Sequence, residues 1–135
     1  LFYQLTRRPN RKKVLLQKVS NKKFWEDFGG RTDKEDSHII ETAFREAAEE
    51  SNKVITKELL EELIKKNRRK CYKITQDNTY FVYLIYVPKK VKDEMTKESF
   101  GEREHHDGIT REVDWVDRTV YFHPRLRKGQ IFFNF

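Results

Sequence analysis

The chain has 135 residues, of which 36% are hydrophobic, 13% aromatic and 38% charged, and its formal net charge is +7. The hydrophobic and aromatic content excludes a disordered chain, and the length predicts a single domain over residues 1–135. No apolar run approaches the roughly 20 residues of a membrane-spanning helix, so we expect no membrane partner.

The N-terminal residue and the single cysteine give two expectations about the protein's context. The chain begins at Leu1, without a Met and inside a strand-like segment, so we expect an N-terminal piece to be missing. No signal peptide is visible. Cys71 cannot form an internal disulfide, which is typical of a reducing compartment, and we expect an intracellular, cytoplasmic protein.

Three strands and a helix are predicted in the first part of the chain. The helix has a suitable N-cap in Ser37, and its helical spacing continues to about Ser51. A polar loop over residues 31–36 separates it from the double glycine Gly29-Gly30. The strand patterns cover residues 2–6, 14–19 and 24–28.

The second part predicts a further helix, a hairpin and a long charged segment. Helical spacing covers residues 56–66, and the hairpin covers 72–75 and 79–87. The second arm is almost continuously apolar or aromatic, which predicts a central strand covered on both faces. Residues 89–108 are charged and lack periodicity, which is typical of a long and often functional loop. Strands interspersed with helices predict an α/β fold with a mixed sheet covered by helices. The remaining patterns are a strand over 111–116, a turn or short helix around Pro124 and a strand over 131–135.

Basic residues form several clusters that are spread along the chain. Such a surface attracts polyanions such as nucleotides or RNA, and the alternative is an ordinary solvated surface. The clusters are Arg7-Arg8, Arg11-Lys12-Lys13, Lys22-Lys23, residues 65–70, Lys89-Lys90 and residues 125–128.

The most informative segment is the helix after the double glycine, because it ends in a cluster of acids. Glu46, Glu49 and Glu50 fall at i, i+3 and i+4, which places three carboxylates within one helical turn. Like charges at this spacing repel each other, so we expect a counter-charge. A divalent cation is one candidate, and a structural ion pair with Lys or Arg is the other.

A helical wheel separates these acids. Arg45 is four residues from both Glu41 and Glu49, and the three form a stripe away from the apolar face. Glu46 and Glu50 lie at the edge of that face, so Glu50 is expected to be partly desolvated and to need a cation or a hydrogen-bond donor. The apolar face comprises Ile40, Ala43, Phe44, Ala47, Ala48 and Ser51.

With the double glycine, this segment resembles the Nudix box, the signature of the Nudix hydrolase family. That pattern is Gly, five residues, Glu, seven residues, Arg-Glu, an aliphatic residue, any residue, Glu-Glu, any residue, Gly and an aliphatic residue. The preceding Trp25 to Gly30 resembles the family's frequent Trp-x-x-Pro-Gly-Gly, with Phe28 in place of Pro. The box itself is matched at Gly30, Arg45-Glu46, Ala47 in the aliphatic place, and Glu49-Glu50.

The chain departs from the box in its first half. The interval from Gly30 to Arg45 is one residue longer than the pattern, which implies an insertion in the loop before the helix. The first Glu of the family helps to hold the Arg, and here either Asp36 or Ser37 stands in its place. We expect Glu41 to take over this role as the i−4 partner of Arg45.

A further departure stands at the end of the helix. Asn52 occupies the place of the second Gly. Asn is the non-Gly residue that best tolerates the left-handed conformation at a helix end, so we expect the backbone of the family to be kept there.

The resemblance implies an alpha/beta/alpha sandwich and Mg²⁺- or Mn²⁺-dependent hydrolysis of a nucleoside diphosphate linked to another moiety. It implies that Glu46, Glu49 and Glu50 hold the metal, with the Gly30 carbonyl as a further ligand. It also implies that Glu46 or a downstream acid is the general base and that Arg45 orients the acids. Glu46, Glu49 and Arg45 are therefore the expected catalytic residues.

Many family members recruit another acid from a later loop, and the charged segment offers several. We select Glu102 or Glu104, with Glu98 and Asp107 as the other candidates. The adjacent His105-His106 pair could ligate a transition metal, although adjacent histidines on a loop usually have no such role.

Two functions compete under this resemblance. The first is an active pyrophosphohydrolase acting on a nucleotide, a dinucleoside polyphosphate or an RNA 5′ end or cap. The second is a catalytically weak Nudix-fold module that binds RNA or a nucleotide. The complete set of Glu46, Glu49 and Glu50 favours the first. A basic RNA-binding domain unrelated to the family would leave the spacing of Gly30 and these acids unexplained.

Overall fold

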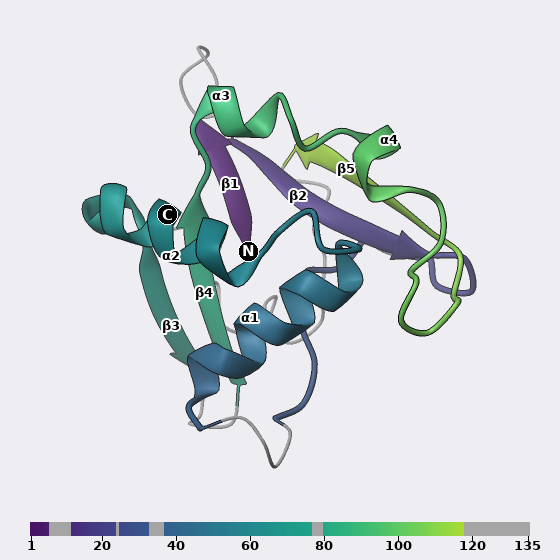
Figure 1. Cartoon of the computed structure of the whole chain (residues 1–135), viewed down its shortest axis with the longest axis horizontal. Coiled ribbons are helices and arrows are strands. Elements are labelled where there is room, and N and C mark those ends of the chain that lie inside the picture. The colour runs from purple at the N-terminus through teal and green to yellow at the C-terminus, as the bar shows by residue number, and fades with distance from the viewer. Residues whose placement is uncertain (6–11, 24, 33–36, 77–79, 118–135) are drawn as a thin grey trace.

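The computed structural model describes residues 1–5, 12–23, 25–32, 37–76 and 80–117. Within these ranges five strands form one sheet in the order β3-β4-β1-β2-β5 (Figure 1). Strand β1 runs parallel to β4, and the other neighbouring pairs are antiparallel, so the sheet is mixed. The strands are β1 (Phe2–Leu5), β2 (Lys12–Val19), β3 (Tyr72–Gln76), β4 (Tyr80–Tyr86) and β5 (Arg111–Asp117).

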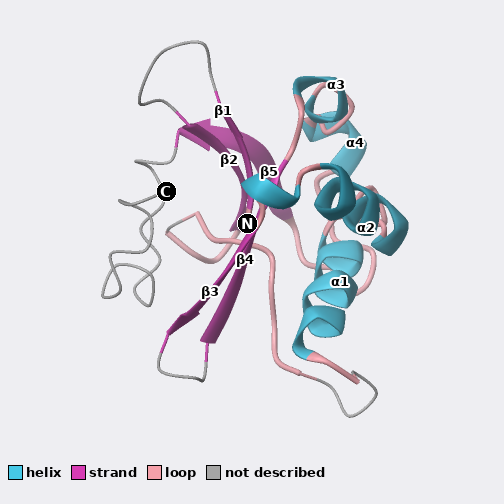
Figure 2. Ribbon diagram, turned by 90° about the vertical axis from the view of Figure 1, so that its left-hand side faces the viewer, coloured by secondary structure: helices cyan, strands magenta, loops and turns pink. Residues whose placement is uncertain are grey.

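The four α-helices of the described residues lie on the same side of this sheet (Figure 2). The predicted α/β class with a mixed sheet is therefore confirmed. Of the two helical layers of the expected sandwich, the described residues supply one. The helices are α1 (Ile39–Glu50), α2 (Lys57–Lys66), α3 (Lys89–Lys92) and α4 (Lys97–Phe100), and a 3₁₀ turn, η1, covers Arg68–Lys70.

Both faces of the central strands are buried, because successive apolar side chains along each strand point to opposite faces of the sheet. On one face, Phe2, Leu15 and Ile85 pack with helical residues in one hydrophobic cluster. Their neighbours point to the other face and form a second cluster, to which Tyr3 and Leu84 belong. Strand β4 contributes to both clusters, which confirms that it is covered on both faces. It lies second from the edge of the sheet, and β1 occupies the centre.

The segment from residue 89 to 108 differs from the long loop that the sequence predicts. It contains the short helices α3 and α4, and α4 begins with a capping box between Thr96 and Ser99. Met95 and Phe100 anchor the segment in the core, with exposures of 2% and 1%. Burial of these two side chains stabilises helices that are too short to form alone.

Two smaller predictions differ in detail. His38 stands at the N-cap of α1 instead of Ser37 and makes no side-chain cap hydrogen bond. Of the strand predicted over 24–28, the structure describes residues 25–28, and there it has one bridge between Glu26 and Gln17. The patterns around Pro124 and over 131–135 lie outside the described residues. Among the described residues, no helix has the length and apolar character needed to cross a membrane.

Candidate active site

Helix α1 carries the acidic cluster and packs one face against the sheet. Its buried residues are Thr42, Phe44, Ala47 and Glu50, which recur with helical spacing. Glu50 is only 8% exposed, so the expectation that this carboxylate is desolvated is confirmed. Glu46 and Glu49 are less buried, with side-chain exposures of 16% and 27%. The three acids of this helical turn therefore differ in burial, and Glu50 is the most deeply buried.

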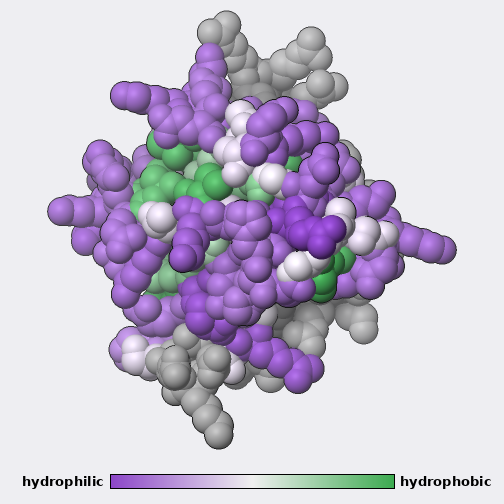
Figure 3. Space-filling view, turned by 45° about the vertical axis from the view of Figure 1, so that its right-hand side comes forward, coloured by the Kyte–Doolittle hydropathy of each residue, from purple (hydrophilic) through white to green (hydrophobic). Residues whose placement is uncertain are grey.

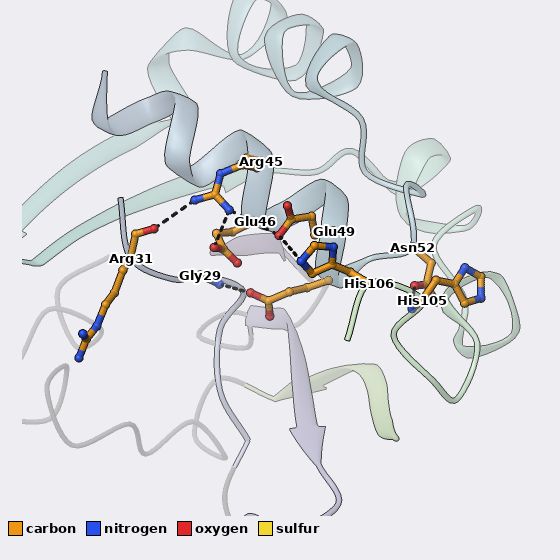
Figure 4. A network of polar contacts seen from close by, with 9 residues as sticks. Gly29, Arg31, Arg45, Glu46, Glu49, Asn52, His105 and His106 are labelled. Carbon is orange, nitrogen blue, oxygen red and sulfur yellow. Dashed lines mark hydrogen bonds and ion pairs between the residues drawn. The ribbon is translucent and has the colours of Figure 1, made fainter. Parts of the chain in front are cut away.

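The buried carboxylate of Glu50 receives hydrogen bonds from two sides. The backbone N–H of Gly29 donates to Oε1 at 2.9 Å (Figure 4). The Gln17 amide on β2 donates to Oε2. Burial raises the pKa of Glu50 to about 9, although these hydrogen bonds act in the opposite direction. The negative charges of Glu46 and Glu104 add to the increase. Carboxylates from two segments thus influence one another at this point.

The less buried acids are held by Arg45. Its Nη1 lies 3.0 Å from Glu46 Oε1 and 3.5 Å from Glu49 Oε2, which confirms the predicted pairing with Glu49. Its Nη2 donates to the backbone carbonyl of Arg31 at 3.1 Å, so the guanidinium also ties the glycine loop to the helix (Figure 4). Glu41, the expected partner on the preceding turn, lies 3.3 Å from Lys57 Nζ on α2. Its role toward Arg45 stays a prediction.

The double glycine lies directly against these acids. A Cβ placed on Gly30 would overlap the carboxylate of Glu46, whereas a Cβ on Gly29 would meet open space. Gly30 thus allows the backbone to approach Glu46 closely, and any side chain at this position would displace the Glu46 carboxylate.

The later acids divide by burial. Glu104 is 8% exposed and lies near Glu50, whereas Glu102, Glu98 and Asp107 are exposed. Burial raises the pKa of Glu104 to about 7, and Asp107 adds to this through a hydrogen bond and its charge. Of the two selected acids, the structure therefore brings Glu104, and not Glu102, to the cluster.

The histidine pair lies beside the same helix. His106 Nε2 is 3.8 Å from Glu49 Oε2, so a protonated His106 would pair with this acid. The backbone N–H of the preceding His105 donates to the Asn52 side chain at 2.7 Å (Figure 4). The loop after α4 therefore contacts α1 at both Glu49 and Asn52.

Two residues near the cluster were not singled out from the sequence. Gln17 shares a face of β2 with the core residue Leu15, and Arg111 shares a face of β5 with Val113. The sequence signal that could have identified them is a polar residue at a position where the alternation of the strand predicts a buried apolar side chain. Arg111 is 3% exposed, and its Nη2 donates to the backbone carbonyl of Glu50 at 3.1 Å.

A cavity of about 550 Å³ begins at the double glycine and continues between α1 and β4. Its lining combines apolar side chains such as Phe28 and Ile40 with Glu50 and two cations, Lys22 and Arg31. Hydrophilic residues cover most of the surface seen in Figure 3, and hydrophobic residues show between them. The cavity is large enough for a nucleotide-sized ligand next to the acids.

Comparison with known proteins decides the family. The NUDIX domain matches residues 5–131, nearly the whole chain. The chain belongs to the Nudix hydrolase family. Neither the curated proteins nor the solved structures that were searched gave a match. Membership indicates a hydrolase that acts on phosphoanhydride bonds of nucleoside diphosphate-linked substrates.

Nudix hydrolases generally use divalent cations, and the donor set of this site fits such an ion. Hard carboxylate oxygens are the ligands that Mg²⁺ prefers. Burial is the main cause of the raised pKa of Glu50, and the negative charges of Glu46 and Glu104 add to it. A bound cation would stabilise the ionised carboxylate and relieve the repulsion between these acids. Among the described residues, no three His, Cys, Asp or Glu side chains form a group that could hold a metal ion as they are arranged. The carboxylates are engaged with Arg45, Gly29 and Gln17 instead.

Proposed function

We propose that this Nudix protein is an Mg²⁺- or Mn²⁺-dependent pyrophosphohydrolase that cleaves a nucleoside diphosphate linked to another moiety. The observation that carries the proposal is the buried carboxylate of Glu50, which lies against Gly29 within one helical turn of Glu46 and Glu49. A desolvated acid next to further acids fits a cation and its phosphate ligands better than it fits a purely structural role.

Glu46, Glu49 and Glu50 would hold the metal, with the Gly30 carbonyl as a further ligand. When bound, a divalent cation polarises phosphoryl oxygens and lowers the pKa of water. Arg45 keeps Glu46 and Glu49 oriented, because its Nη1 lies within 3.5 Å of both carboxylates. We assign it to the acids and not to the substrate.

Glu46 and Glu104 are the candidates for the general base that deprotonates the attacking water. The pKa of Glu104, raised to about 7, lies near neutral pH, where a base is most effective. The water oxygen would bond to phosphorus as a P–O bond of the anhydride breaks, which leaves two phosphate-containing products.

The charge distribution supports a polyanionic substrate. Lys22 and Arg31 line the cavity that begins at the acids, and the whole chain carries a net charge of +7. Nucleotides, dinucleoside polyphosphates and RNA 5′ ends or caps all meet this requirement. We expect the group attached to the diphosphate to occupy the cavity between α1 and β4.

The proposal is tested with a panel of substrates, each assayed with Mg²⁺ and with Mn²⁺. The panel contains capped RNA, dinucleoside polyphosphates, nucleoside triphosphates and nucleotide sugars. Glu49→Gln should abolish metal-dependent turnover, a loss of at least about a hundredfold, because a charged ligand is removed. Glu58→Gln, the same change at an exposed position on α2, is the control and should remain active.

Two results would contradict this assignment. Unchanged turnover in Glu49→Gln would remove the acidic helix from the mechanism. Tight RNA binding by the wild type without hydrolysis of any panel member would favour the alternative, a Nudix-fold module that binds RNA or a nucleotide.

A further inference from the structure

The residue that replaces the second Gly of the Nudix box has a backbone suited to glycine. Asn52 follows α1 with a φ of 54°, in the left-handed region. Its N–H donates to the Glu49 carbonyl at 3.3 Å, and the next N–H, of Lys53, donates to the Ala48 carbonyl at 2.8 Å. These two bonds form the helix-ending arrangement in which Gly is most common. Glycine would meet the requirements of this backbone, so the backbone conformation does not explain why position 52 carries a side chain.

The side chain of Asn52 makes three hydrogen bonds to the last residue of α4 and to the loop that follows it. Its Nδ2 donates to the carbonyl of Phe100 at 2.7 Å and to that of Arg103 at 2.8 Å. Its Oδ1 accepts from the N–H of His105 at 2.7 Å (Figure 4). Both amide hydrogens and the amide oxygen are used, so glycine could reproduce none of these contacts.

The segment held in this way carries acids and a histidine to the candidate active site. Glu104 lies between two of the three contact points and is 8% exposed. His106, one residue beyond the last contact point, has its Nε2 3.8 Å from Glu49 Oε2. Asn52 therefore connects the end of the acidic helix to the loop that brings Glu104 to it.

Other contacts secure the beginning of the loop or join it to β5. Arg111 donates to the carbonyls of Gly101 and Phe100, the latter at 3.0 Å. The N–H of Arg111 donates to the Glu102 carbonyl at 2.8 Å, and the N–H of Glu104 donates to the Ile109 carbonyl at 3.0 Å. The contacts of Asn52 with Arg103 and His105, together with the approach of His106 to Glu49, thus tie the later part of the loop to the end of α1.

We propose that Asn52 is a positioning residue that holds the Glu104 loop beside Glu46, Glu49 and Glu50 and thereby strengthens divalent-cation binding. The inference rests on the proposed function, because it assumes that these acids bind the metal. This role gives a reason for Asn in the place of the family's Gly, since Asn tolerates the left-handed backbone conformation and its side chain also reaches the loop.

The first test measures whether the loop loosens when the side chain is removed. Asn52→Gly keeps the backbone conformation accessible and deletes the three hydrogen bonds. Amide hydrogen exchange of residues 101–106 should become about tenfold faster, because each lost bond weakens the closed loop. Lys53→Gly is the matched control, since Lys53 also has a positive φ, of 63°, and is exposed. It should leave the exchange of this loop unchanged.

The second test measures Mn²⁺ affinity without substrate, by titration of both variants and the wild type. Asn52→Gly should weaken binding by about tenfold, the size typical of residues that support metal ligands, and Lys53→Gly should not. Unchanged exchange in Asn52→Gly would overturn the inference, and so would faster exchange with wild-type Mn²⁺ affinity. Failure of the wild type to hydrolyse any substrate would instead contradict the proposed function, while the exchange comparison still decides whether Asn52 holds the loop.

Discussion

Residues of the same type have different properties at this site because their surroundings differ. Burial raises the pKa of Glu50 to about 9, although the carboxylate accepts hydrogen bonds from Gly29 and Gln17 that act in the opposite direction. Glu46 and Glu49, within the same turn, are more exposed and pair with Arg45. The helical spacing determines how deeply each acid is buried, and the partners of each carboxylate determine its electrostatic environment.

The double glycine offers a test with a built-in control. In Gly30→Ala the added methyl group would overlap the Glu46 carboxylate, which must then move away from Arg45. We expect kcat to fall by about tenfold or more with little loss of stability, because a small displacement of a ligand is costly for catalysis. Gly29→Ala adds the same methyl group in open space and should change kcat little. Equal effects of the two changes on kcat would contradict the close approach at Gly30.

Among the elements, the strands and the two longer helices were predicted, and the two shortest helices were not. Helices α1 and α2 and strands β1 to β5 were all expected near their observed bounds, since each carries a clear apolar pattern. Helices α3 and α4 have four residues each, too few for a periodic signal. They exist because Met95 and Phe100 are buried beside β5, a contact that no local pattern reveals.

The anchoring of α4 can be measured through its buried aromatic residue. Phe100→Ala should lower the free energy of unfolding by about 3–5 kcal/mol, the usual cost of a cavity left by a buried Phe. Phe100 is 1% exposed, whereas Glu98 on the same helix is exposed, so Glu98→Ala should have little effect. Urea unfolding of both variants checks this expectation. A small loss in Phe100→Ala would show that α4 does not belong to the core.

At the scale of the whole molecule, the buried acids link stability to pH. The folded protein keeps a proton on Glu50 up to a pKa of about 9, while the unfolded chain releases it near the ordinary value of 4.5. Between these values the folded state binds more protons. The free energy of unfolding of the metal-free protein should therefore fall as pH rises, by at most about 1.4 kcal/mol per pH unit for this group. Glu104, with a pKa of about 7, acts in the same direction below that pH.

This linkage is measured by urea unfolding with a chelator between pH 5 and pH 8. Glu50→Gln removes the ionisable group and should reduce the slope. Added Mg²⁺ should restore stability at pH 8, because an ion that binds only the folded state stabilises it. A metal-free stability that rises over this pH range, in the wild type as much as in Glu50→Gln, would contradict the assigned environment of Glu50.

The sequence by itself determined the α/β class, the periodic elements, the family and the acids on α1. These features are local: a helix places residues three and four apart on one face wherever it occurs, and the Nudix spacing is read within one segment. Gln17, Asn52, Glu104 and Arg111 gained their roles only in the tertiary structure. Gln17, Glu104 and Arg111 come from segments other than α1, and Asn52, directly after α1, bonds through its side chain to Arg103 in the loop after α4. These contacts between distant segments arise from tertiary packing, which no spacing along the chain encodes.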